Sequence, residues 1–140
     1  MVLLNAVRSS NASIASRLPA GLVAVFVGAT NGIGETTLKQ FAKHARKPRV
    51  YFLGRSQEAG ARIAAECKAL NAEGEFTFMG ADLSLIRNVD EVCRDIKTKE
   101  KSVNLLFLTQ GTLVTGVGTS TIYIPSSLGK DGCLFKPRAI

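Results

Sequence analysis

Residues 21–34 read Gly-Leu-Val-Ala-Val-Phe-Val-Gly-Ala-Thr-Asn-Gly-Ile-Gly, a pattern that by itself predicts one βα unit. A run of small and β-branched apolar residues ends at Gly28, as in a strand that is buried on both faces of a parallel sheet. Gly32 and Gly34 follow, and a helical pattern begins there. This order predicts a phosphate site, because the turn exposes backbone N–H groups and glycine lets a pyrophosphate come close. A βα turn in an unrelated α/β domain would show the same pattern.

Three more strands and two more helices are expected after this unit. Apolar periodicity predicts strands at 21–27, 49–53, 75–79 and 103–108, and helices at 32–45, 57–70 and 85–101. Ser56 and Ser84 stand where the N-caps of the second and third helices are expected. Strict alternation of strands and helices predicts an α/β fold with a Rossmann-like, doubly wound parallel sheet, here truncated to about four strands. The expected strand order is 3-2-1-4, with a ligand crevice between strands one and four.

The chain has 140 residues, of which 46% are hydrophobic and 21% charged, so it fits one globular domain. We expect an N-terminal arm at 1–20, a cofactor-binding half-domain at 21–113, and an irregular or disordered tail at 114–140, where glycine, proline, serine and threonine break the periodicity. The arm contains Arg8 and Arg17 and no acidic residue. Its apolar residues Val2, Leu3, Leu4 and Val7 are expected to pack on the domain surface. A mitochondrial transit peptide is the alternative.

Several classes of function are disfavoured by composition. The formal net charge is +7, but the basic residues cluster at helix ends and no aromatic residue lies among them to stack bases, so no nucleic-acid partner is expected. Three distant cysteines and one histidine predict neither a metal site nor a disulfide framework, and a reducing, cytoplasmic compartment is the default. No apolar run approaches transmembrane length, so no membrane partner is expected.

The candidate site surrounds the glycine turn. The backbone cradle for a dinucleotide pyrophosphate would come from Gly28, Thr30, Asn31, Gly32, Ile33 and Gly34. The spacing Gly-x-x-x-Gly-x-Gly differs from the usual Gly-x-Gly-x-x-Gly pattern. At the end of strand two, where NAD binders carry an acidic residue, the chain has Arg55 and Ser56. A cation there would attract a 2′-phosphate and favour NADP(H), although Arg55 could also be an ordinary surface arginine.

The position of Asp82, after strand three, places its carboxylate at the rim of the crevice. It could accept a hydrogen bond from an adenine amino group, or it could only help to cap the third helix. Together with Gly28–Gly34, Gly54-Arg55 and Leu108-Thr-Gln-Gly111, the motif Ala81-Asp82-Leu83 resembles the first half of a short-chain dehydrogenase/reductase, closest to fungal NADPH-dependent members. The resemblance implies binding roles that also include Leu83 and Gly111. It further implies oxidoreduction of a ketone or alcohol with NADPH.

Two departures from the family concern the chemistry. The family has Asn-Asn-Ala-Gly after strand four, whereas both asparagines are replaced here. The family's proton donor is a Tyr-x-x-x-Lys pair, in which the ammonium lowers the pKa of the phenol. The positions four residues after Tyr51 and Tyr123 hold Arg55 and Ser127. The chain is therefore expected to be catalytically incomplete, and three readings stay open: a reductase that obtains its proton donor elsewhere, a non-catalytic dinucleotide-binding fragment, or a protein that self-associates through the exposed edge of strand four.

Overall fold

The computed structural model describes residues 3–111, apart from the side chain of Ala15. The expected tail at 114–140, with Tyr123 and Cys133, lies outside the described residues. The elements in chain order are α1 (Leu4–Ala12), α2 (Ile14–Arg17), β1 (Val23–Val27), α3 (Gly32–His44), β2 (Arg49–Gly54), α4 (Gln57–Leu70), β3 (Glu75–Gly80), α5 (Ile86–Lys99) and β4 (Leu105–Leu108). Each strand and helix predicted for the domain is present, with boundaries shifted by one or two residues.

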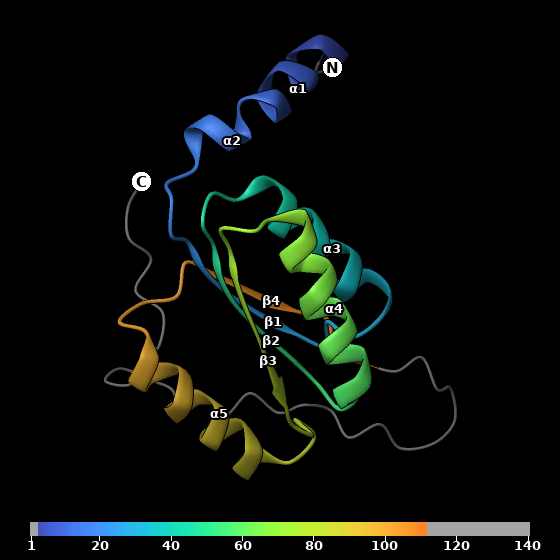
Figure 1. Ribbon diagram of the computed structural model, residues 1–140, viewed down its shortest axis with the longest axis vertical. Coiled ribbons are helices and arrows are strands. Elements are labelled where there is room, and N and C mark those ends of the chain that lie inside the picture. Colours follow the sequence, from blue (N-terminus) through green and yellow to red (C-terminus); the bar gives the residue numbers. More distant parts are fainter. Residues whose placement is uncertain (1–2, 112–140) are drawn as a thin grey trace.

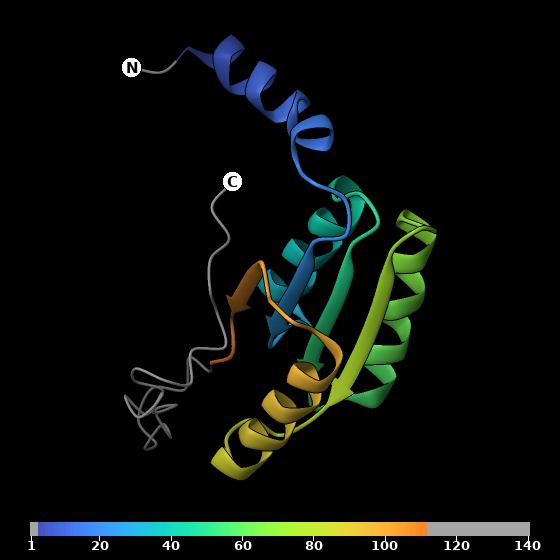
Figure 2. The ribbon, with the colours of Figure 1, turned by 90° about the vertical axis from the view of Figure 1, so that its left-hand side faces the viewer.

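The four strands form a parallel sheet in the order β3-β2-β1-β4, as predicted (Figure 1). Every residue of β1 is buried, because both faces of this central strand are covered. In Figure 2, α3 and α4 lie on one side of the sheet and α5 lies on the other. This arrangement is the doubly wound α/β architecture, and it follows from right-handed connections between neighbouring parallel strands.

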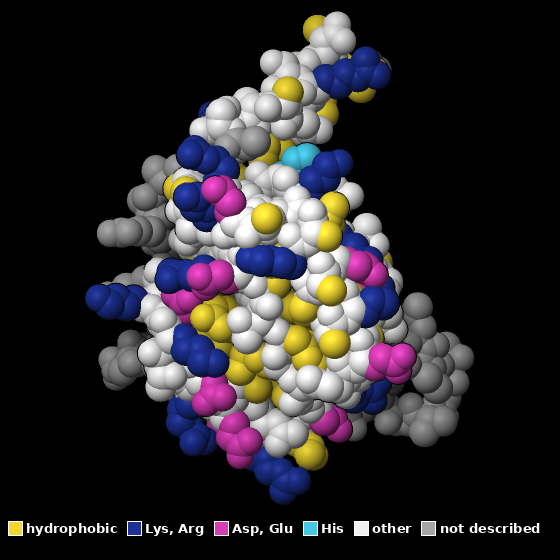
Figure 3. All heavy atoms as spheres, in the orientation of Figure 1, with side chains coloured by type: hydrophobic (Ala, Val, Ile, Leu, Met, Phe, Trp, Pro, Cys, Tyr) yellow, Lys and Arg dark blue, Asp and Glu magenta, His cyan; other side chains and the backbone are white. Residues whose placement is uncertain are grey.

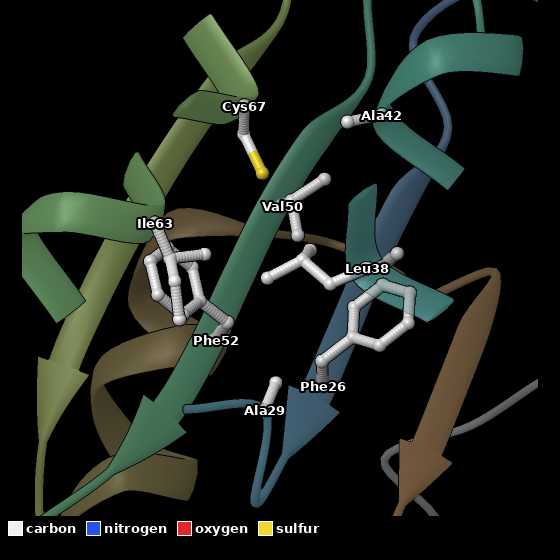
Figure 4. Close-up of a cluster of buried hydrophobic side chains, with 9 residues drawn as sticks. Phe26, Ala29, Leu38, Ala42, Val50, Phe52, Ile63 and Cys67 are labelled. Carbon is white, nitrogen blue, oxygen red and sulfur yellow. The ribbon is translucent and has the colours of Figure 1, made fainter. Parts of the chain in front are cut away.

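Two apolar cores occupy the two faces. Alternate residues of β1 and β2, among them Phe26 and Phe52, point toward α3 and α4, where Leu38 and Ile63 are fully buried against them (Figure 4). The residues between them point toward α5, where Ile96 is the buried member of that helix. Side chains on successive strand residues face opposite sides of the sheet, so one strand can supply both cores.

The N-terminal arm differs from the sequence prediction. It forms α1 and α2, which stand clear of the domain (Figures 1 and 2), and α1 has no buried residue. Leu3 is 74% exposed, Leu4 63% and Val7 42%, so the prediction that they pack on the domain is wrong for these three. Val2 lies outside the described residues. The chain leaves α2 through an extended backbone at Leu18, with φ −73° and ψ 135°, which keeps the arm from folding back onto the domain.

The predicted cap of the third helix is also wrong. Leu85 occupies the N-cap position of α5, and no side chain there accepts a hydrogen bond from the first turn. Ser84 instead donates its hydroxyl to the carboxylate of Asp82, 2.8 Å away, which ties it into the preceding turn. By contrast, Ser56 is the N-cap of α4, as predicted, and its Oγ accepts a hydrogen bond from the N–H of Ala59 at 3.2 Å.

No helix among residues 3–111 is both long and apolar enough to cross a bilayer. In the same part of the chain, no three His, Cys, Asp or Glu side chains gather in a way that could hold a metal ion.

Candidate cofactor-binding edge of the sheet

The carboxyl ends of the four strands lie at one edge of the sheet. Val27 at the end of β1 is in register with Leu53 on one side and with Leu108 on the other. Gly54 and Gly80, the last residues of β2 and β3, are also paired. The four segments that follow the strands therefore meet at this edge, and they contain all of the predicted site residues. Ligands of open α/β sheets bind at such an edge.

The turn after β1 is pressed against the segment after β4. The backbone of Gly28 has φ +78°, and a Cβ atom on it would lie 2.7 Å from the backbone nitrogen of Gln110. A Cβ atom on Gly34 would lie 2.5 Å from the carbonyl oxygen of Gly28 and from Oγ1 of Thr109. Packing within the protein thus already requires glycine at both positions, since any side chain there would collide with backbone.

The start of α3 leaves hydrogen-bond donors open. Asn31 occupies the N-cap position, but its side chain makes no capping hydrogen bond. The first backbone N–H of α3 with an acceptor among the described residues is that of Glu35, which donates to the carbonyl of Asn31 at 3.2 Å. The N–H groups of Gly32, Ile33 and Gly34 precede it. Unpaired donors at a helix N-terminus carry positive partial charge and attract anions.

The space beside this helix start is also open. Gly32 has φ +56°, and nothing lies within 4 Å of a Cβ atom built on it. The next residue, Ile33, is 76% exposed, the largest exposure of any large hydrophobic side chain in the part of the chain that the structure describes. An open glycine at positive φ beside an exposed apolar side chain suits a turn that a phosphate and a ribose approach from outside. The residues present therefore fit a dinucleotide pyrophosphate.

Thr30 positions this turn on the neighbouring strand. A Cβ atom on Gly54 would collide with the Thr30 side chain, so the two residues pack directly against each other. The N–H groups of Gly28 and Ala29 both donate to the carbonyl of Leu53, at 3.0 and 3.3 Å. These contacts hold the turn over the end of β2, where Arg55 begins the next segment.

Arg55 and Ser56 follow β2 at the surface. Both side chains are exposed, and Arg55 forms no ion pair with any residue of the described range. The Ser56 oxygen accepts from α4, which leaves its O–H free to donate. A free guanidinium and a free hydroxyl donor therefore stand side by side at the start of a helix.

Asp82 shapes the turn after β3. Its Oδ1 accepts hydrogen bonds from the N–H of Ser84 at 3.1 Å and from the Ser84 hydroxyl at 2.8 Å. These hydrogen bonds, followed by the positive charge of Arg55, lower the pKa of the Asp82 carboxyl. The carboxylate is ionised at neutral pH and keeps Oδ2 for a further donor. The neighbouring Leu83 is partly buried and packs against the core on the α5 side.

The segment after β4 contains residues that sequence reasoning missed. The Thr109 N–H donates to the Val27 carbonyl at 2.9 Å, and its hydroxyl donates to the same oxygen at 3.0 Å. Gln110 has a buried Oε1 with no hydrogen-bond partner among the described residues. Gly111 borders open space. The sequence feature that could have identified Thr109 is its position directly after a strand, at the same edge of the sheet as the glycine turn.

The tyrosine that the structure describes lies away from this edge. Tyr51 is in the middle of β2, paired with Val25 and Thr77, and it is buried on the α5 side. Its hydroxyl donates to Glu100 at 3.0 Å. Burial, and then that hydrogen bond, raise the pKa of the Tyr51 phenol. This tyrosine is a structural residue.

Comparison with known proteins shows the family of the chain. The sequence model described as short chain dehydrogenase matches residues 22–122. The chain belongs to this family. An oxidoreductase of Emericella nidulans, AN1596, is 41% identical over 122 residues, which cover 87% of this chain and 36% of that protein. The oxidoreductase andH of Emericella variicolor is 42% identical over 65% of this chain and 27% of its own length. The chain spans about a third of the length of these short-chain dehydrogenase relatives.

Several solved structures share the fold. L-sorbose reductase from Gluconobacter frateurii, in complex with NADPH and L-sorbose, has a TM-score of 0.60 at 22% identity, over 66% of this chain and 34% of that one. The RhlG/NADP active-site complex of Pseudomonas aeruginosa has a TM-score of 0.56 at 26% identity, over 66% of this chain and 36% of its own. A metagenomic short-chain oxidoreductase in complex with NADP has a TM-score of 0.56 at 25% identity, over 62% and 38%.

Proposed function

We propose that the carboxyl edge of the sheet binds NADP(H). Two features at one edge support this most directly: the N–H groups at the start of α3 and the Arg55 side chain after β2 have no partner within residues 3–111. The helix start suits the pyrophosphate, and the guanidinium suits a 2′-phosphate, which NAD lacks. The NADP complexes of RhlG and of the metagenomic short-chain oxidoreductase support the same choice, since both proteins share this fold.

The remaining site residues fit supporting roles. The Ser56 hydroxyl would donate to the 2′-phosphate while its oxygen caps α4. Oδ2 of Asp82 would accept from the adenine amino group, which an ionised carboxylate does well. Because the Leu83 side chain packs into the core, its contribution to the adenine pocket would come from its backbone. Gly111, with open space beside it, would let the nicotinamide half lie close to the chain.

Replacing Arg55 tests the proposal directly. We expect Arg55→Asp to weaken NADPH binding about 10- to 100-fold, because it removes a charge-assisted hydrogen bond and adds repulsion, and to change NADH binding little. The measurement is a titration of the protein with each nucleotide, followed by nucleotide fluorescence. Arg94→Asp is the matched control, since Arg94 is an exposed arginine on α5 away from the edge. Equal losses of affinity for NADPH and NADH would mean that Arg55 does not contact the 2′-phosphate.

The activity we propose is that of the family, hydride transfer between NADP(H) and a ketone or alcohol, with this chain alone lacking the proton donor. The 140-residue sequence contains no Tyr-x-x-x-Lys pair, and the hydroxyl of Tyr51 donates a hydrogen bond to Glu100. NADPH should therefore bind without turnover on a broad panel of carbonyl compounds. Steady oxidation of NADPH that depends on an added ketone would show that the chain is catalytically complete.

The setting we propose is the cytoplasm. Cys67 and Cys93 are free thiols, one buried and one partly buried. Burial raises the pKa of both, that of Cys67 to about 11, so neither is a reactive thiolate at neutral pH. Free, unreactive thiols are what a reducing compartment allows.

A further inference from the structure

The arm carries an apolar stripe with no partner in the described structure. Leu3 and Val7 lie about one helical turn apart at the start of α1, and Ile14 and Leu18 lie about one turn apart, from the start of α2 to its C-cap. Ser13 is both the C-cap of α1 and the N-cap of α2, so the arm consists of two short helices, each with an apolar pair. Four of the large apolar side chains of this segment, Leu3, Leu4, Val7 and Ile14, are 36–74% exposed.

Positive charge borders this stripe. Arg8 directly follows Val7 on α1, and Arg17, on α2, directly precedes Leu18, so each short helix carries one arginine beside its apolar pair. The first acidic residue of the chain is Glu35. Arginine side chains at the borders of an apolar stripe can keep their charged ends in water while the stripe is buried, as in helices that lie flat in a lipid interface.

A second basic feature lies where the arm joins the domain. The N–H of Gly21 donates to the carbonyl of Arg46 at 2.9 Å, which places the base of the arm against the basic loop, residues 43–47. Lys43 and Arg46 are exposed and form no ion pair with a described residue, and Lys47 has only an exposed pair with Glu73. In Figure 3, Lys and Arg side chains lie on both sides of the base of the arm.

We propose that the arm and the basic loop together form a docking surface for an anionic lipid membrane, with α1 and α2 lying in the headgroup region. The positive charge of the arm favours an anionic membrane, rather than a second copy of the chain, as the partner of this surface. Two copies packed stripe to stripe would bring four arginines together with no acidic residue among residues 1–34 to offset them, whereas anionic headgroups offset them directly. The basic loop adds charge at the same end of the molecule. The sequence predicted no membrane partner because no apolar run could span a bilayer, but a helix that lies in the headgroup region needs no such run.

This docking leaves the cofactor edge accessible. The arm enters the amino end of β1 and the basic loop precedes the amino end of β2. The candidate cofactor site is at the carboxyl ends of the same strands. The protein would face the membrane with one edge of its sheet and expose the other to the aqueous phase. The inference is independent of the proposed cofactor, and its test needs no nucleotide.

The first experiment tests the stripe. The full 140-residue chain is floated with vesicles of phosphatidylcholine alone, or with roughly a third phosphatidylserine. We expect binding to the anionic vesicles, at least about tenfold weaker binding to the neutral ones, and at least a tenfold loss of anionic binding in Leu3→Ser/Val7→Ser. The control Leu70→Ser/Leu85→Ser changes two exposed leucines of the domain and should bind like the unaltered chain. Equal losses in both variants, or no flotation of the unaltered chain, would overturn the proposal.

The second experiment tests the charge. Lys43→Glu/Arg46→Glu should lower binding to the anionic vesicles about tenfold or more, and Lys97→Glu/Lys101→Glu, with the same change in net charge, should not. Thermal unfolding confirms that each variant is folded. Equal binding to neutral and anionic vesicles would overturn the role of charge. Stripe-dependent dimerisation by light scattering, without flotation, would assign the surface to a second copy instead.

Discussion

Gly34 lies where the turn after β1 meets the segment after β4. Its spacing from Gly28 predicted a phosphate turn, and the helix start does have the open donors of such a turn. The structure shows a second reason for glycine, since a Cβ atom on Gly34 would lie 2.5 Å from Thr109 Oγ1, contributed by a residue far away in the chain. A local pattern reveals the first reason and not the second, because only folding brings residues 34 and 109 together.

A residue-scale prediction follows for Gly34→Ala. The added methyl would press on backbone that cannot move aside, so we expect the free energy of unfolding to fall by about 1–3 kcal/mol. Chemical denaturation of the two proteins gives the difference. Gly111→Ala is the control, because nothing lies within 4 Å of that Cβ position and its effect should be within about 0.5 kcal/mol. A Gly34→Ala protein as stable as the parent would mean that the turn and the β4 segment are not in contact.

At the scale of elements, α3 and α4 are joined by a network of four charged side chains. Glu35 and Lys39 of α3 each pair with α4, Glu35 with Arg62 and Lys39 with Glu66, and Arg62 also pairs with Glu66. The hydrogen bonds from Arg62 and then from Lys39 lower the pKa of the Glu35 carboxyl from 4.5 to about 2. Both helices were predicted from their apolar faces, whereas this polar contact depends on how they pack side by side on the sheet.

The network predicts a pH dependence of stability. The lowered pKa of Glu35 means that its stabilising effect is complete above pH 4.5 and is lost as the pH falls from 4.5 to about 2. Because the Arg62 side chain is 49% exposed, we expect an effect of only about 1 kcal/mol. Glu35→Gln should flatten the dependence of unfolding free energy on pH in this range, and Glu58→Gln, in the first turn of α4 and outside this network, should not. Identical pH profiles for all three proteins would contradict the prediction.

At the scale of the whole molecule, the arm and the domain are separate in their packing. Deleting residues 1–17 should change the free energy of unfolding by less than about 1 kcal/mol, because α1 has no buried residue. By comparison, Leu38→Ala removes a fully buried side chain and should lower it by about 2–5 kcal/mol. Thermal or chemical unfolding measures both, and a deletion as harmful as Leu38→Ala would show that the arm packs on the domain after all.

The free side of β4 gives a second prediction at this scale. Within residues 3–111 β4 pairs with β1 only, and Leu106 and Leu108 are 38% and 46% exposed. Such an edge favours association. We expect the chain to self-associate as its concentration rises, and Leu106→Lys/Leu108→Lys to shift it toward monomer in light scattering. Leu70→Lys, at an exposed leucine of α4, is the control. A chain that stays monomeric at every concentration would contradict this prediction.

The positions of the strands and helices, the glycine turn and the cap at Ser56 were determined by the sequence itself, because each depends on residues close together in the chain: apolar periodicity, a backbone that needs glycine, and a hydroxyl three residues before its N–H partner. Tertiary structure alone decided where the arm lies and what contacts the glycine turn. The apolar residues of the arm predicted burial, but the extended backbone at Leu18 leads away from the domain and these residues stay exposed. Thr109 reaches the carbonyl of Val27 because β4 pairs with β1, although the two residues are far apart in the chain. Such contacts depend on how distant segments pack in space, which a local pattern does not contain.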